Sequence, residues 1–495
     1  MNGGRAMAAL CATAILAACN VGPSYRKPEI AVPAAFGEAQ SMLPASTPGD
    51  LSKWWTSFHD SELDSLVARA LAANLDLLSA ASRVRQAREQ EVIAGAAEWP
   101  SLNATGFGLN MHSNSNPLSE LAGGGGAGGG APPNTPTNIK LYSAGFDASW
   151  EIDLFGGTRR AVEAARANTA ATRWELHDGE VTLSAEIAND YLNLRAAQTR
   201  IVLLDSELKD QRQLFDLVRA RARAGFVTEL DVNQQRNLLS NTQAQIPALD
   251  AEVHVMTHAL AVLLAEPPES IARELQESAA FPAAAPDLPM TLPADLLRRR
   301  PDIREAERKL AAATAEEGVA IAELYPKIDL IGAASFTGSA LRGLLSTNNF
   351  GTVGIGSIMW PIFEGGKIRA GIRSSKETEL QAYFAYRKAV LGALQDVEDA
   401  LARYTDEQRH DRALMDAENA AASSEGIARQ QYVEGLVTFI NVLTAQTSLL
   451  AARDQLVQGR QTLAQDLGAL YKALGGGWDE TSVNWKPSPH NPEAG

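Results

Sequence analysis

The stretch AGFVTELDV at residues 224–232 returns as EGLVTFINV at residues 434–442. Each copy interrupts a long helical run in which apolar residues recur at heptad spacing. A glycine between two such runs indicates a tight turn, because glycine adopts backbone angles that other residues avoid. The chain therefore contains two similar helix–turn–helix elements.

The duplication extends outward from these turns. Glycine pairs at 156–157 and 365–366 precede the long helical runs, and two strand-like stretches precede each pair. Further upstream, NLDL at 74–77 matches RPDI at 300–303. A unit of two strands and two long helices that occurs twice indicates a repeat architecture.

Composition shifts mark the boundaries between these parts, since proline- and alanine-rich stretches interrupt the helical pattern. The expected divisions are a signal peptide at 1–18, a lipidated strap at 19–50, a first repeat at 51–265 with a β-hairpin at 100–154, a connector at 266–298, a second repeat at 299–474 with a β-hairpin at 326–363, and a tail at 475–495.

The composition favours long packed helices over compact globular cores. Of the 495 residues, 6% are aromatic and 21% are charged. The run from 158 to 223 has no proline, and as one helix rising ~1.5 Å per residue it would span roughly 100 Å. Several shorter helices in a bundle are the alternative.

The strand-like stretches alternate apolar and polar residues. Between Tyr142 and Leu154 every second residue is apolar, and the stretch from Lys327 to Thr337 largely repeats the pattern. Alternation over about ten residues is typical of membrane barrel strands, although a soluble sheet packed on helices also produces it. Gly106 interrupts the first strand and predicts a bulge there.

Four strands are too few for a closed barrel, because membrane barrels need about eight. An open sheet in lipid would leave edge N–H and C=O groups without partners. If the strands cross a membrane, several chains must therefore share one barrel. Two, three or four copies satisfy this requirement equally.

The N-terminus is expected to be a targeting segment. Arg5 precedes a short apolar stretch, and Leu16-Ala17-Ala18-Cys19 has the form of a lipobox, in which the Cys19 thiol accepts a lipid. An ordinary signal peptide with a chance cysteine is the alternative. No other segment approaches 18 apolar residues, so we expect no transmembrane helix.

The combined motifs resemble one family across residues 16–475. They are the lipobox, VGPSY at 21–25, Trp54-Trp55 with Phe58, RRPDI at 299–303 and LQDVEDAL at 394–401. With the duplicated layout, they resemble the outer-membrane efflux lipoproteins, which are the NodT-type factors of the TolC-like family.

This resemblance implies an α+β membrane protein and a homotrimer. Each chain would give four β-strands to a shared 12-stranded barrel in the outer membrane. Its long helices would form a coiled-coil tunnel through the periplasm. Asn20 after Cys19 fits the sorting of lipoproteins to the outer membrane. Gly156, Gly157, Gly365 and Gly366 would lie where strands become helices.

In the family, the turns at Gly225 and Gly435 lie at the periplasmic tip, where they serve the turn itself and the docking of an adaptor. Asp231 matches an acidic gate residue and Glu229 lies close to it, whereas Asn441 replaces an aspartate common in the second copy. A helix cap is the alternative role for Asp231.

Tyr432 matches a family tyrosine that ties inner helices to outer ones. Three copies of Asp231 around one axis would form an acidic ring that attracts cations. Arg83 and Lys309 occupy equivalent places in the two copies, and solvated helix charges are the simpler account of both.

The chemistry of the chain indicates transport rather than catalysis. The seven histidines show no metal-site spacing, the glycine runs lack a phosphate-binding context, and a net charge of −15 disfavours nucleic acid. We expect no enzyme activity, no metal and no cofactor other than the lipid on Cys19.

The preferred function is a passive exit duct of a tripartite efflux pump. It would carry small molecules supplied by an inner-membrane RND transporter through a periplasmic adaptor. A duct for type I polypeptide secretion and a non-channel periplasmic scaffold lipoprotein are the alternatives.

Overall fold

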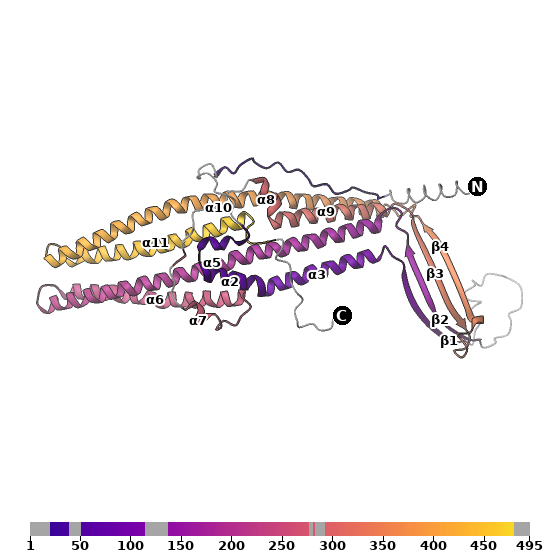
Figure 1. Cartoon of the computed structure of the whole chain (residues 1–495), viewed down its shortest axis with the longest axis horizontal. Coiled ribbons are helices and arrows are strands. Elements are labelled where there is room, and N and C mark those ends of the chain that lie inside the picture. Colours follow the sequence, from indigo (N-terminus) through magenta and orange to yellow (C-terminus); the bar gives the residue numbers. More distant parts are fainter. Residues whose placement is uncertain (1–19, 39–50, 114–136, 277–280, 283–292, 480–495) are drawn as a thin grey trace. The chain divides into compact units, whose positions relative to one another are not determined.

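The computed structural model describes residues 20–38, 51–113, 137–276, 281–282 and 293–479 (Figure 1). The signal peptide and Cys19 lie outside these residues, as do residues 277–280 and 283–292 of the connector and the end of the tail. Contacts divide the chain into two units. Unit 1 comprises residues 1–27, 86–169 and 309–382, and unit 2 comprises 28–85, 170–308 and 383–495. Each unit therefore draws on both sequence repeats.

Unit 1 contains one antiparallel sheet in the order β1-β2-β3-β4. Its strands are β1 (Ser101–Ser113), β2 (Thr137–Glu151), β3 (Lys327–Gly338) and β4 (Phe350–Met359), with the short 3-10 helix η3 (Thr347–Asn349) before β4. Within the part of the chain that is described, β1 and β4 each have one unpaired edge. Such edges are the surfaces on which further strands can pair.

The expected bulge at Gly106 is wrong. Gly106 pairs with Ala144 in an unbroken register that runs from Ser101 opposite Ser149 to Ser113 opposite Thr137. Glycine therefore fits the regular ladder at this position, and its lack of a side chain accounts for the interrupted alternation.

Tryptophans join the strands to the preceding helices in the same way in both repeats. The Trp150 indole donates to the carbonyl of Glu98, just after α3 (Leu75–Ala96), at 3.2 Å. The Trp360 indole donates to the carbonyl of Leu324, just after α9 (Pro301–Ala322), at 3.1 Å. Both bonds satisfy carbonyls near helix ends.

The glycine pairs lie where β2 and β4 lead into the long helices. Gly156 has φ of +85° and precedes α5 (Gly157–Arg223), and Gly365 and Gly366 have φ of +57° and +87° before α10 (Lys367–Glu434). Left-handed backbone of this kind favours glycine. The structure thus places all four glycines of the two pairs at strand–helix turns.

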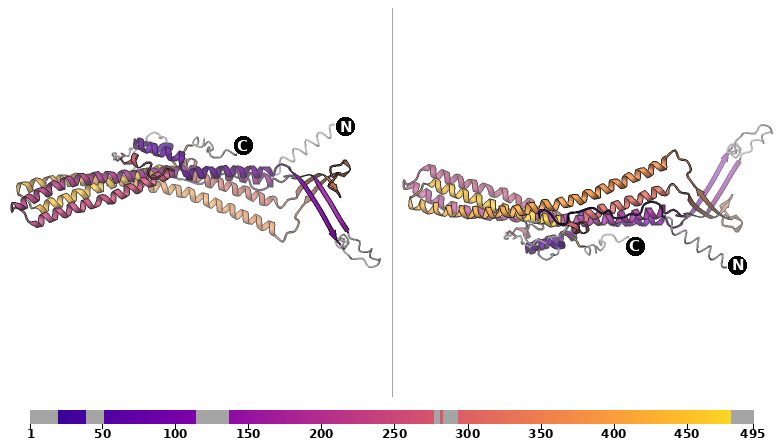
Figure 2. Two further views of the ribbon diagram at one scale, coloured as in Figure 1. Left: turned by 90° about the horizontal axis from the view of Figure 1, so that it is seen from below. Right: turned by 90° about the horizontal axis from the view of Figure 1, so that it is seen from above.

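Unit 2 is built on two helical hairpins, in which α5 is followed by α6 (Glu229–Leu263) and α10 by α11 (Phe439–Ala473). Figures 1 and 2 show the turns of both hairpins at the same end of this unit. The expectation of one long helix is confirmed, because α5 is a single helix of 67 residues. Of its heptad positions, Ile187, Leu194 and Leu208 are buried.

The main core of unit 2 surrounds the tryptophan pair. Trp54, Trp55 and Phe58 of the 3-10 helix η2 (Leu51–Phe58) are buried, and Trp54 stacks on Tyr471 of α11 at 5.4 Å. Helix α2 (Ser61–Ala73) continues this core through Leu63 and its neighbours. The short helices α7 (Ala272–Leu275) and α8 (Pro293–Arg299) lie in the connector.

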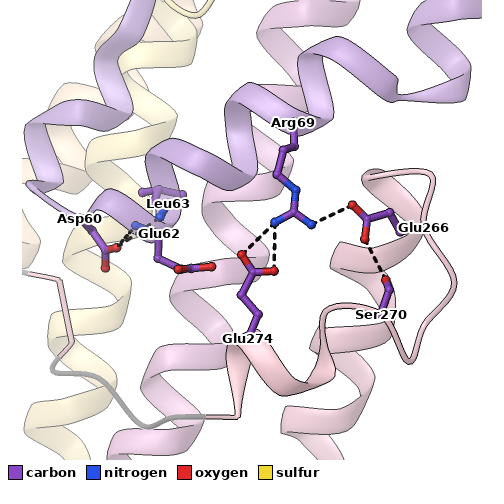
Figure 3. Close-up of polar contacts among 7 residues, drawn as sticks. All are labelled: Asp60, Glu62, Leu63, Arg69, Glu266, Ser270 and Glu274. Carbon is purple, nitrogen blue, oxygen red and sulfur yellow. Dashed lines mark hydrogen bonds and ion pairs between the residues drawn. The ribbon is translucent and has the colours of Figure 1, made fainter.

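Arg69 of α2 holds the start of the connector (Figure 3). Its guanidinium bonds both carboxylate oxygens of Glu274, at 2.9 and 3.0 Å, and one oxygen of Glu266 at 2.8 Å. The Gln198 amide of α5 donates to the carbonyl of Leu275 at 2.6 Å. The carboxyl of Glu62 points toward Glu274, and burial followed by this neighbour raises the pKa of Glu62.

We expected no transmembrane helix, but one helix in the described part of the chain passes a simple test for one. Helix α6 is long and apolar enough to cross a membrane by length and composition alone. Its buried positions include Gln235, Thr242 and Thr257, which is the pattern of a helix packed against other helices of the chain. Only 22% of the most apolar 18-residue window of α6 is buried within the described chain, so its seam in unit 2 accounts for a minor part of its apolar content.

Candidate functional site: the hairpin tip

The two hairpin turns have the same hydrogen-bond pattern. Gly225 donates to the carbonyl of Ala222 and Phe226 to that of Arg221, at 2.9 and 3.0 Å. The second turn repeats this, with bonds of 3.1 Å from Gly435 to Tyr432 and 2.8 Å from Leu436 to Gln431. This is the Schellman motif, which satisfies the last carbonyls of α5 and α10.

Asp231 closes a capping box at the start of α6. Its carboxylate accepts from the backbone N–H and from the hydroxyl of Thr228, both at 2.8 Å, and its own N–H donates to that hydroxyl. Glu229 lies in the same first turn and is exposed. The sequence left two roles for Asp231, a gate residue or a helix cap. Within one chain, Asp231 has the geometry of a helix cap.

Asn441 occupies the matching place in α11 but makes a different contact. Its amide nitrogen donates to the Thr438 hydroxyl at 3.2 Å, and the Thr438 side chain does not cap the helix. The first hairpin thus presents a carboxylate where the second presents an amide. A ring built from both positions would alternate charged and neutral groups.

Tyr432 lies in the contact between the two hairpins. Its side chain is 3% exposed, and the Arg221 guanidinium of α5 lies 4.7 Å from its ring centre. Arg221 also donates to the carbonyls of Tyr432 and Val433, both at 3.1 Å. One arginine therefore satisfies carbonyls at the end of α10 and stacks on its tyrosine.

An apolar cluster joins all four helices beside this tyrosine. Its buried members are Leu214, Val218, Val232, Tyr432, Phe439 and Val442. Because α5, α6, α10 and α11 each contribute to the cluster, the two turns are held together as one tip. The sequence showed the two turns, but it did not show this shared core.

Three buried glutamines lie one helical turn from the cluster, on the side away from the turns. Gln211, Gln235 and Gln446 are at most 3% exposed, and the side-chain oxygen of each has no hydrogen-bond partner among the described residues. Gln235 donates to the carbonyl of Gln211 at 3.2 Å. A buried amide oxygen calls for a hydrogen-bond partner, so this layer is polar where the neighbouring cluster is apolar.

Four large apolar side chains are exposed at the tip. Phe226 and Leu436 follow the two turn glycines and are 81% and 68% exposed. Leu230 and Ile440, at the next matching positions, are 64% and 49% exposed. Exposed apolar side chains gathered at one end of a protein mark a surface for a partner.

The RRPDI and LQDVEDAL motifs meet elsewhere in unit 2. Arg300 pairs with Asp302 at 2.8 Å and Asp396 at 2.9 Å beside a cavity of about 330 Å³. Burial raises the pKa of Asp178, which also lines this cavity. These contacts fasten the start of α9 to α10. Across the described ranges, no three His, Cys, Asp or Glu side chains are grouped to hold a metal.

The chain matches the model of the outer membrane efflux protein family over residues 66–266 and 292–476. It is 33% identical over 442 residues to nodulation protein T of Rhizobium leguminosarum bv. trifolii, covering 88% of this chain and 89% of that protein. It is 34% identical over 474 residues to the pyoverdine export outer membrane protein OpmQ of Pseudomonas aeruginosa, covering 95% and 96%.

The solved structure of the outer-membrane channel OprN superposes with a TM-score of 0.84 at 33% identity, covering 93% of this chain and all of that one. The α+β fold expected from the sequence is therefore confirmed as that of the trimeric TolC-like outer-membrane channels. These relatives are named as channels and export proteins rather than as enzymes. The chain belongs to the outer membrane efflux protein family, as an efflux factor of the NodT type.

Proposed function

We propose that three copies of the chain form the outer-membrane exit duct of a tripartite, RND-type efflux pump. The observation that carries this is the combination of a four-stranded sheet with two open edges and a family match over most of the chain. Open edges need partners in lipid, and neighbouring copies would supply them. The pyoverdine export protein OpmQ supports small molecules as the cargo.

The duct would be anchored by a lipid on Cys19 and would extend into the periplasm. A periplasmic adaptor would dock on the exposed apolar residues of the tip, among them Phe226 and Leu436. An inner-membrane transporter would supply the energy. Asp231 would form the acidic part of the gate, and Tyr432 would hold the two hairpins together while the gate is closed.

Accumulation of a fluorescent dye tests this function in cells. Loss of the gene should raise dye accumulation, and the wild-type chain should restore export. A Phe226→Ser, Leu436→Ser double variant should still form heat-modifiable trimers but restore little export, because its adaptor surface is polar. Unchanged dye accumulation without the gene, for every dye that the partner transporter carries, would contradict the proposal.

A further inference from the structure

The sheet of unit 1 carries an apolar groove of about 410 Å³ near the strand ends that adjoin the helices. Trp150 pairs with Leu330 and Leu330 with Gly356, while Gly332 pairs with Gly354 two residues along. Alternate residues of a strand share a face, so these five lie on the same side of the sheet. Trp150 and Leu330 border the groove, and the three glycines form its floor.

The glycine floor is open. A Cβ atom placed on Gly332 or Gly354 would have no heavy atom within 4 Å, and one on Gly356 would touch only the Leu330 side chain at 3.5 Å. None of the three has a positive φ, so neither packing nor backbone strain within the chain requires glycine there. Glycine inside a strand often marks the close approach of another molecule. The bare backbone of these glycines, bordered by Trp150 and Leu330, leaves room for a hydrocarbon chain.

The strap fixes the N-terminal end of the described chain beside the same strand ends. Val21 donates to the carbonyl of Phe155 at 3.1 Å, and the buried Arg160 donates to the carbonyls of Val21 and Gly22, both at 3.3 Å. Asn20 lies so close to Gly156 that a Cβ there would come within 2.0 Å of its side-chain oxygen. Asn20 is therefore held at the turn between β2 and α5.

We propose that an acyl chain of the lipid on Cys19 lies in this groove, over Gly332, Gly354 and Gly356. The proposal rests on the lipidation of Cys19. Trp150 and Gly156 are six residue steps apart, a span of at most about 20 Å. One acyl chain covers roughly half of the ~30 Å hydrocarbon core, and the glyceryl group and Cys19 add to this reach. Because the lipid is attached to the chain through Cys19, its effective concentration at the groove is higher than that of a free lipid.

Photo-crosslinking tests the proposal on the full-length trimer. Cells are grown with a fatty acid that carries a diazirine near its methyl end, and the trimer is purified, irradiated, digested with trypsin and read by mass spectrometry. The expected product joins the N-terminal peptide, Cys19 to Arg26, through its lipid to a peptide containing residues 330–332 or 354–356.

The other products are distinguishable. Free-lipid adducts on the groove, without the N-terminal peptide, would show that bulk lipid occupies it and would overturn the proposal. An acylated N-terminal peptide joined only to other sites would also overturn it. Absence of acylation on Cys19 would overturn the proposal, because there would be no lipid anchor. The duct function would then be tested separately by the dye assay.

A pair of matched substitutions on β4 tests whether the groove must be open. Gly354→Leu places a side chain on the floor and should reduce the joined product to background. Gly351→Leu makes the same change on the opposite face of β4, where a Cβ also has no heavy atom within 4 Å, and should leave the product unchanged. The heat-modifiable trimer band checks that both variants assemble. Equal yields from Gly354→Leu and wild type would contradict the assignment.

Discussion

Gly225 and Gly435 have the same left-handed backbone, with φ of +80° at the ends of α5 and α10. A Cβ at either position would have no heavy atom within 4 Å, so the demand for glycine comes from the backbone alone. The pair could be predicted from the repeated sequence, because a turn between two helical runs is a local property. Phe226 and Leu436 follow the glycines and are exposed for the same local reason.

Gly435→Ala should weaken the tip. An L-residue in the left-handed region costs roughly 1–2 kcal/mol, partly offset by the lower entropy of the unfolded chain. Hydrogen exchange of residues 435–438 should therefore be faster in the variant. Gly426→Ala is the matched control on α10, because Gly426 also has open surroundings but no positive φ. Slowed exchange at 435–438 in Gly435→Ala would contradict this account.

Asp231 has two candidate roles that one substitution separates. Asp231→Asn removes the charge but keeps an oxygen that can accept from Thr228, whereas Asp231→Ala removes both. If three carboxylates form a ring, both variants should lose cation preference, measured as a shift of the reversal potential in a salt gradient. Asn441→Ala, which removes no charge, should change conductance less. If Asp231→Asn keeps the cation selectivity of the wild type, the carboxylate ring is contradicted and the helix cap is the remaining role of Asp231.

At the scale of elements, long helices and strands were predictable because the spacing of apolar residues in the sequence differs between a helix and a strand. Contacts between elements were not. Nothing local indicates that Arg221 of α5 stacks on Tyr432 of α10, or that three glutamines form a buried layer beside the tip cluster. The regular pairing of Gly106 was missed for the same reason, since the register of β1 depends on its partner strand.

The contact between α2 and the connector should depend on pH. Burial, the Glu274 carboxyl and Asp60 raise the pKa of Glu62, while Arg195 opposes them. A carboxyl whose pKa is raised by folding imposes no penalty at pH values below its unfolded pKa, and destabilises the fold as pH rises through its folded pKa. We therefore expect the contact to be tightest near the ordinary pKa of 4.5 and to loosen as pH rises above it.

Hydrogen exchange of residues 264–276, corrected for intrinsic rates, measures this change. Glu62→Gln should abolish the loosening, because its amide donates to Glu274 at every pH. Asp64→Asn is the control, since burial and Asp60 also raise the pKa of Asp64 without a contribution from the connector. The lowered pKa of Glu266 acts in the opposite direction, below 4.5. Protection that stays constant with pH in the wild type would contradict the prediction.

At the scale of the whole molecule, the duplication and the motifs were enough to predict the fold and the family. The need for several copies also followed from the sequence, because four strands cannot close a barrel. The number of copies did not, since physics permits more than one closed ring, and resemblance supplied the trimer. The strap contacts of Arg160 likewise required the structure, because they join residues far apart in the sequence.

Single-channel conductance in a planar bilayer tests the duct most directly. Purified, lipidated protein should insert and give small, cation-preferring current steps, and the steps should grow in Asp231→Ala because the tip gate is loosened. This result would establish a shared barrel that is open through the membrane. No steps from either protein, with insertion confirmed by protease protection, would contradict the duct and favour a scaffold.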